Sequence, residues 1–220
     1  VYKRQIGYGS SCTGIVAGYL GTNALECLIE NVYVSGTVSG IQQVGGIGGI
    51  FAKGTVRNCY ADVKVIGSSR AGGIVAEPRN AVVVENCFAT GTLYSTGNAG
   101  GIAGGLNGNN PTIKGCIAWN EQIDGEPVSG RVIGWQSNTY TKATDCYAKK
   151  NMIIAWGPNK GMTGADANTA GTYDWGNNKT AICHGITTEN SVDAAKKIGW
   201  STDIWDLSGV TPLLKSFNDK

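Results

Sequence analysis

The side chains suited to acid–base chemistry gather in one stretch of the chain. They are Asp62, Lys64, Glu77, Arg79 and Glu85. A glycosidase or polysaccharide lyase needs clustered carboxylates, or a carboxylate beside a metal and a base, on one face of its fold. In the repeats described below, Asp62 aligns with Ser35 and Thr90, so no column of carboxylates forms. The pattern favours solvated surface charges, and a carbohydrate-active enzyme is the alternative.

The sequence gives little support for a metal site or for a nucleophilic catalytic residue. The chain has one histidine, His184, so it cannot form the H-E-x-x-H pair of a zinc peptidase. Cys183 and His184 are neighbours in sequence, which does not by itself place thiolate and imidazole in contact. Residues 46–51 miss the dinucleotide fingerprint, because Phe51 stands in place of its third glycine. We therefore expect no catalytic residue, no metal site and no cofactor.

The composition indicates a folded chain of nearly neutral charge. It has 220 residues, 41% of them hydrophobic, 34 glycines and a net charge of +2. Such a small charge gives no electrostatic case for nucleic acid or an acidic membrane. No apolar run approaches the roughly 20 residues that span a bilayer. The seven cysteines are an odd number, so at least one stays unpaired, and whether the others form disulfides is open.

Residues 1–5 (VYKRQ) read like a translated sequencing adapter. We expect them to be non-native and exclude them from the fold argument. On this interpretation the native N-terminus is missing, and with it any signal sequence or lipid anchor. The oligomeric state is not predicted.

Two sequence blocks recur along the chain with one period. The first has an asparagine, aspartate or glycine before a small apolar residue. Its copies are residues 30–34, 57–61, 85–89, 114–118 and 144–148, at spacings of 27, 28, 29 and 30 residues. The second, glycine-rich block lies at residues 14–15, 46–47, 73–74, 101–102 and 131–132. Two independent blocks with nearly the same spacing predict a repeat array.

Each repeat reads as a set of short strands. Gly-Gly pairs inside the units disfavour helices, and residues 59–65 alternate between small apolar and larger or polar side chains. Alternation of this kind is typical of a half-buried strand. We therefore predict an all-β fold, a right-handed parallel β-helix (β-solenoid) of about five coils over residues 6–150.

Stacking the coils in register turns aligned positions into columns. A cysteine column should point into the core, where thiols behave as small hydrophobes; its members are Val32, Cys59, Cys87, Cys116 and Cys146. A turn column precedes it: Asn31, Asn58, Asn86, Gly115 and Asp145. A third column alternates in charge and would pair opposite charges on adjacent strands: Glu30, Arg57, Glu85 and Lys114.

An aromatic column follows the cysteines. It comprises Tyr33, Tyr60, Phe88, Ile117 and Tyr147. By alternation from the buried cysteines it faces outward, which predicts an exposed stripe able to bind a sugar face or a protein. The candidate binding residues are Tyr33, Tyr60, Phe88 and Tyr147. The alternatives are that the turn changes the alternation, or that the C-terminal segment covers the stripe.

Residues 151–220 lack the repeat and contain four tryptophans, Trp156, Trp175, Trp200 and Trp205. Residues 188–191 offer helix N-cap candidates, residues 192–198 predict one short helix, and Gly199 would end it. A short strand is expected over residues 210–214. Because an open solenoid end exposes strand edges and core, we expect this segment to be a C-terminal cap packed on the solenoid.

With these repeats laid out, the chain resembles proteins that carry the GLUG motif, named for Gly-Leu-any-Gly. The matching stretches are residues 46–49 (GIGG), 73–76 (GIVA) and 101–104 (GIAG), and the resemblance covers about residues 14–215. The chain departs from the motif by isoleucine in place of leucine, by Ala76 in place of the last glycine, and by a degenerate copy at residues 130–134.

The resemblance implies a bacterial extracellular or surface-anchored protein. Such repeats occur in adhesin-like proteins of gut bacteria and beside the catalytic domain of immunoglobulin A-cleaving metallopeptidases, and the motif itself carries no catalytic residues. The expected function is a non-catalytic structural or adhesive module that binds a host or dietary glycan or a protein partner. The alternatives are a polysaccharide lyase or glycosidase, and a scaffold segment of a larger secreted metallopeptidase.

Overall fold

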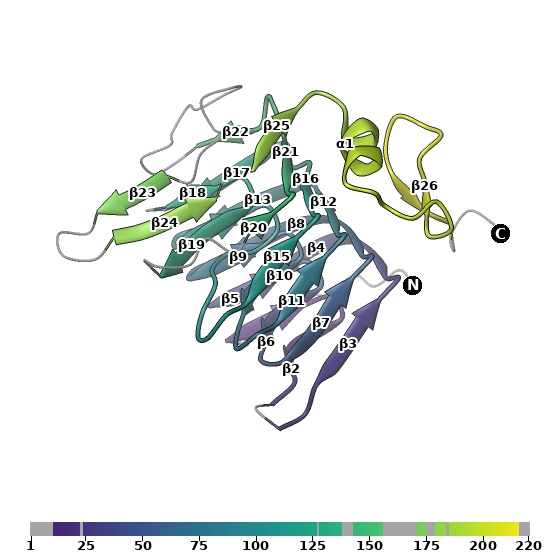
Figure 1. Cartoon of the computed structure of the whole chain (residues 1–220). Coiled ribbons are helices and arrows are strands. Elements are labelled where there is room, and N and C mark those ends of the chain that lie inside the picture. Colours follow the sequence, from purple (N-terminus) through teal and green to yellow (C-terminus); the bar gives the residue numbers. More distant parts are fainter. Residues whose placement is uncertain are drawn as a thin grey trace.

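A computed structural model describes residues 11–22, 24–126, 128–137, 143–155, 171–174, 179–183 and 185–215. Five coils of parallel strands stack on one another, and one short helix follows near the C-terminus (Figure 1). The predicted parallel β-solenoid is confirmed. Residues 1–5, Trp156, Trp175 and His184 lie outside the described residues. Within the described part, no helix is long and apolar enough to cross a membrane.

Two sheets carry the glycine-rich blocks. Sheet A consists of β1 (Cys12–Gly14), β5 (Gln43–Gly45), β9 (Arg70–Gly72), β14 (Asn98–Gly100) and β18 (Ser129–Gly130). Sheet B consists of β2 (Ala17–Leu20), β6 (Gly48–Phe51) and β10 (Val75–Pro78). Single bridges through Ala103 carry sheet B on to β19 (Ile133–Ser137).

Two more sheets close each coil. Sheet C consists of β3 (Cys27–Glu30), β7 (Gly54–Arg57), β11 (Val83–Glu85), β15 (Thr112–Lys114) and β20 (Ala143–Thr144). Sheet D contains β4 (Tyr33–Ser39), β8 (Tyr60–Gly67), β12 (Phe88–Thr90), β13 (Thr92–Ser95), β16 (Ile117–Ala118), β17 (Gln122–Gly125), β21 (Tyr147–Lys149), β22 (Ile153–Ile154) and β25 (Ile186–Thr188).

The glycines are required because sheets A and B approach each other at backbone distance. A Cβ added to Gly72 at the end of β9 would lie 2.1 Å from the carbonyl oxygen of Val75. A Cβ on Gly49 would lie 2.6 Å from the backbone nitrogen of Thr13. Contacts this short exclude any side chain. The glycine-rich block is therefore the bend at which the chain turns sharply from sheet A into sheet B.

The columns stack in the predicted register. Glu30 pairs with Arg57, Arg57 with Glu85, and Glu85 with Lys114. Arg57 donates two hydrogen bonds to Glu30, of 2.8 and 2.6 Å. Four cysteine side chains lie buried in the core: Cys59, Cys87, Cys116 and Cys146. Burial raises the pKa of the Cys87 thiol, which keeps it protonated and apolar.

The turn column is confirmed by its backbone. Asn31, Asn58, Asn86, Gly115 and Asp145 all have φ between 51° and 57°. This is the left-handed region, which glycine adopts freely and asparagine and aspartate adopt more readily than other residues. The recurring turn between sheets C and D therefore selects these residue types.

Replacing Asn86 separates turn geometry from side-chain contacts. An Asn86→Ala variant should lose about 1–2 kcal/mol of unfolding free energy, because the Cβ of alanine is strained in the left-handed backbone conformation. An Asn86→Gly variant should lose less than about 1 kcal/mol, since Gly115 holds the same place one coil further on. Urea unfolding measures both. An equal loss in the two variants would show that the amide contacts, and not φ, determine the choice.

The C-terminal segment covers a side of the solenoid as well as the last coil. The strand β25 pairs with β21, and β24 (Lys179–Cys183) pairs with β19 and with β23 (Gly171–Asp174). The helix α1 (Ser191–Lys197) and the pair β26 (Trp205–Asp206) and β27 (Leu213–Leu214) lie against the outer side of sheet D (Figure 1). Asn190 is the N-cap and Gly199 follows the helix with φ of 77°, as predicted.

Candidate functional site

The aromatic column faces away from the solenoid core but is largely covered. Phe88 is fully buried, Tyr60 is 9% exposed and Tyr147 6%, while Tyr33 is half-buried. They form a second core with the residues of α1, β26 and β27. The expectation of an exposed stripe is wrong, and the alternative that the C-terminal segment covers it is correct. An outward apolar column is too large to leave in water.

Trp200 fastens this cover. Its ring meets Phe88 edge-on at 6.4 Å and stacks on Trp205 at 4.3 Å between centroids. Its indole Nε1 donates a 2.8 Å hydrogen bond to the carbonyl oxygen of Gly115. Burial raises the pKa of Tyr60 beneath this cover. The four predicted binding residues are thus parts of a structural interface.

Glu77, a candidate for acid–base chemistry, is locked in ion pairs. Its carboxylate is fully buried between sheets A and B and pairs with the guanidinium groups of Arg70 and Arg79, the latter at 2.5 Å. Gln43 and Asn107 donate further hydrogen bonds of 3.3 and 2.8 Å to the carboxylate. With both oxygens held in this way, Glu77 joins strands of neighbouring coils and is not free to accept a proton from substrate.

Of the other four candidates, all of them among the described residues, Arg79 alone contacts Glu77. Asp62 and Lys64 lie exposed on β8, and Glu85 lies in the charge column of sheet C. In the ranges that the structure describes, no group of three or more histidines, cysteines, aspartates or glutamates could hold a metal ion. Apart from the Glu77–Arg79 ion pair, the five candidates form no common site.

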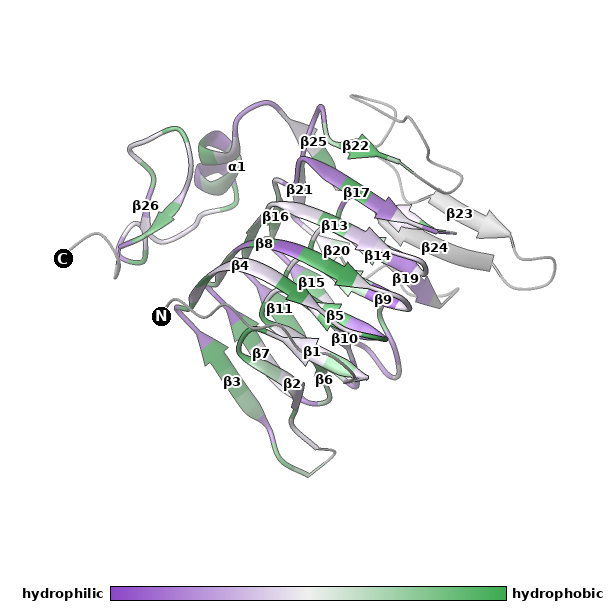
Figure 2. Cartoon of the chain, turned by 180° about the vertical axis from the view of Figure 1, so that it is seen from behind, coloured by the Kyte–Doolittle hydropathy of each residue, from purple (hydrophilic) through white to green (hydrophobic). Residues whose placement is uncertain are grey.

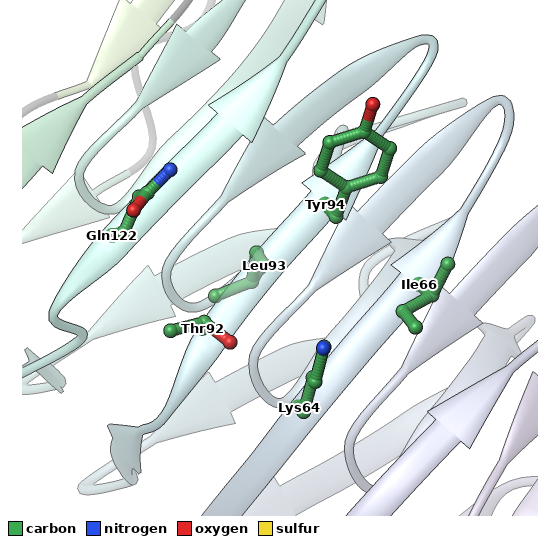
Figure 3. A pocket seen from close by; sticks show the side chains of 6 residues that line it. All are labelled: Lys64, Ile66, Thr92, Leu93, Tyr94 and Gln122. Atoms are coloured by element: carbon green, nitrogen blue, oxygen red, sulfur yellow. The ribbon is translucent and has the colours of Figure 1, made fainter.

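An open depression of about 450 Å³ lies on the outer face of sheet D, away from α1. It is lined by Lys64, Ile66, Thr92, Leu93, Tyr94 and Gln122 (Figure 3). We call it the sheet D groove. The strands β4, β8, β13 and β17, which form this part of the face, cross the front of the stack in Figure 2. The Tyr94 side chain is 52% exposed.

Strand alternation builds the groove. Val65, Leu93 and Ile123 point into the core, so the residues beside them point out. Thr92 pairs with Gln122, and Tyr94 pairs with Ile66 on one side and with Asp124 on the other. A short threonine between the longer Lys64 and Gln122 leaves the hollow. The groove thus offers one aromatic face, one ammonium group and two side chains able to form hydrogen bonds.

Only Lys64 of this groove was identified from sequence. Val65 lies six positions after Cys59, and Leu93 lies six positions after Cys87. Ile123, the register partner of Leu93, lies seven positions after Cys116. One extra residue in the fourth coil therefore breaks the alignment before it reaches Gln122. The available signal was the alternation of residues 92–95 themselves, which places Thr92 and Tyr94 on one face.

The fold resembles one solved structure. A crystal structure of a candidate immunoglobulin A1 protease from Bacteroides ovatus matches with a TM-score of 0.70 and 25% sequence identity. The match covers 94% of this chain and 64% of that chain, so this chain spans under two thirds of its length. No family model and no curated protein matches the sequence.

Proposed function

We propose that this chain is a non-catalytic structural and adhesive module of a bacterial surface protein, built from GLUG-type repeats and exposed outside the cell. Its binding surface is the sheet D groove, and its ligand is a glycan. Among the five acid–base candidates only Glu77 and Arg79 come together, and Glu77 is fully occupied by its ion pairs. The motif resemblance and the likeness to a Bacteroides ovatus protein support a bacterial extracellular setting.

The observation that carries the proposal is the exposed Tyr94 ring beside groups that form hydrogen bonds. A sugar presents an apolar ring face and a rim of hydroxyl groups. Tyr94 supplies a flat apolar surface for the former. Thr92 and Gln122 supply donors and acceptors for the latter. This pairing of one apolar surface with a few polar groups is typical of small-molecule sites.

Removing the Tyr94 ring tests the proposal. On a glycan array, the Tyr94→Ala variant should lose at least about tenfold in affinity, as expected for a central aromatic contact. The Tyr19→Ala variant is the matched control, because Tyr19 is equally exposed at 53% but lies in sheet B. Equal binding by both variants and the unaltered chain would contradict a site at the groove, provided that all three have the same melting temperature.

A second candidate is a scaffold segment of a larger secreted metallopeptidase. It is favoured by the match to most of this chain but to only 64% of the candidate immunoglobulin A1 protease. Sequencing the complete reading frame tests it. A zinc-binding H-E-x-x-H helix elsewhere in that frame would support the scaffold function, and a frame with surface-anchoring segments and no such helix would count against it.

A further inference from the structure

We propose that the sheet D groove selects an acidic sugar, a single uronate carboxylate set among neutral sugar residues. This inference rests on the proposed glycan-binding function and names the ligand class for the same site. It follows from the charge of one lining residue, the charges that flank the groove, and the arrangement of its polar side chains (Figure 3).

Lys64 supplies the charge. Among the described residues that line the groove, Lys64 alone carries a charge. Its side chain is exposed, and no ion pair joins it to a described carboxylate. A ligand that covers the ammonium group removes water from it, which is costly unless the ligand brings an opposite charge. A sugar carboxylate meets this requirement, whereas a neutral hydroxyl meets it only in part.

Two aspartates limit the charge density of the ligand. Asp62 lies two residues before Lys64 on the same outer face of β8, and it accepts a 2.8 Å hydrogen bond from Thr90. Asp124 lies beside Tyr94 as its register partner on β17. A densely charged polymer would place further anions against these carboxylates. Because like charges repel, the groove favours isolated carboxylates over sulfated chains.

The remaining lining residues orient the ring. Tyr94 and Ile66 form an apolar side, and Thr92 forms the floor between Lys64 and Gln122. A pyranose ring against Tyr94 would lie with its carboxylate toward Lys64 and its hydroxyl groups toward Thr92 and Gln122. Lys64 thus determines the preference for acidic over neutral sugars, while Tyr94 contributes to the binding of both.

Three polymers test the inference by titration calorimetry. They are a polysaccharide that alternates a uronate with a neutral sugar, the same polymer after reduction of its carboxyl groups, and a densely sulfated polysaccharide. The unaltered chain should bind the first at least tenfold more tightly than the other two, and this preference should weaken with added salt. The Lys64→Gln variant should bind the native and the reduced polymer equally, and Lys64→Arg should keep the preference. The control variant Lys114→Gln replaces an exposed lysine on sheet C and should leave the affinity for all three polymers unchanged.

The outcomes separate the two proposals. Equal binding of the native and reduced polymers would overturn the acidic-sugar inference and leave glycan binding in place. Tighter binding of the sulfated polymer would also overturn it. Absence of binding to every glycan, in this assay and on the array, would overturn the proposed function itself. A shared melting temperature among the variants shows that each comparison is made on folded protein.

Discussion

Replacing Glu77 with alanine should cost the fold about 3–5 kcal/mol of unfolding free energy, the range expected when one partner of a buried ion pair is removed. The change leaves two guanidinium groups, of Arg70 and Arg79, without their shared carboxylate. Burial, and after it the charge of Arg79, lowers the pKa of Arg70, as expected for a guanidinium group withdrawn from water. Urea unfolding followed by circular dichroism measures the loss.

The Glu30→Gln variant is the matched control. Glu30 also pairs with an arginine of the next coil, at 2.6 Å, but its side chain is 39% exposed. Solvent-exposed pairs contribute at most about 1 kcal/mol, so this variant should remain close to the unaltered chain. If Glu77→Ala lost no more stability than Glu30→Gln, Glu77 would not hold sheets A and B together, and a chemical function for its carboxylate would have to be reconsidered.

A Trp200→Ala variant should lose about 3–5 kcal/mol, the usual cost of deleting a buried tryptophan ring. Trp200 is 4% exposed and loses contacts with Phe88 and Trp205 as well as its hydrogen bond to Gly115. Because these contacts join the C-terminal segment to the solenoid, the segment should open before the coils do. Hydrogen exchange should therefore rise in α1 and at the strands under Phe88, while sheets A to C remain protected.

Leu213→Ala is the control for this change. Leu213 belongs to β27 but is 40% exposed, so its removal should leave exchange in α1 unchanged. A rise in exchange spread evenly over all five coils of the Trp200→Ala variant would contradict the separate opening of the cover. It would mean that cover and solenoid unfold as one cooperative unit.

The repeat could be predicted from sequence because identical positions stack on one another. Each coil repeats the same turn, so Asn58 and Asn86 meet the same left-handed backbone requirement. The alternating charges of Glu30, Arg57 and Glu85 predicted the register correctly for the same reason. Periodicity turns local preferences into several independent signals for one arrangement.

A C-terminal cap was predicted, and cover of the aromatic column was one alternative, but the contacts that hold the cover in place could not be predicted because they lie outside the repeat. Nothing in the spacing of Trp200 shows that its ring reaches Gly115, 85 residues earlier. The ion pairs of Glu77 depend on the sharp bend between sheets A and B, which brings Arg70 and Arg79 together around it. Tyr94 lies shortly after Gly91, whose φ is positive, and the next coil is one residue longer. The repeat alignment therefore gave no column that contains Tyr94.

The most direct test of the account is whether the purified chain binds an acidic polysaccharide without cleaving it. The polymer is incubated with the chain, the bound fraction is recovered, and its length and its new reducing or unsaturated ends are measured. We predict retention of full-length polymer that is lost in the Tyr94→Ala variant, with no new ends. Shortened polymer with new ends, formed at a rate proportional to the amount of protein, would contradict the account and show that this solenoid is an enzyme.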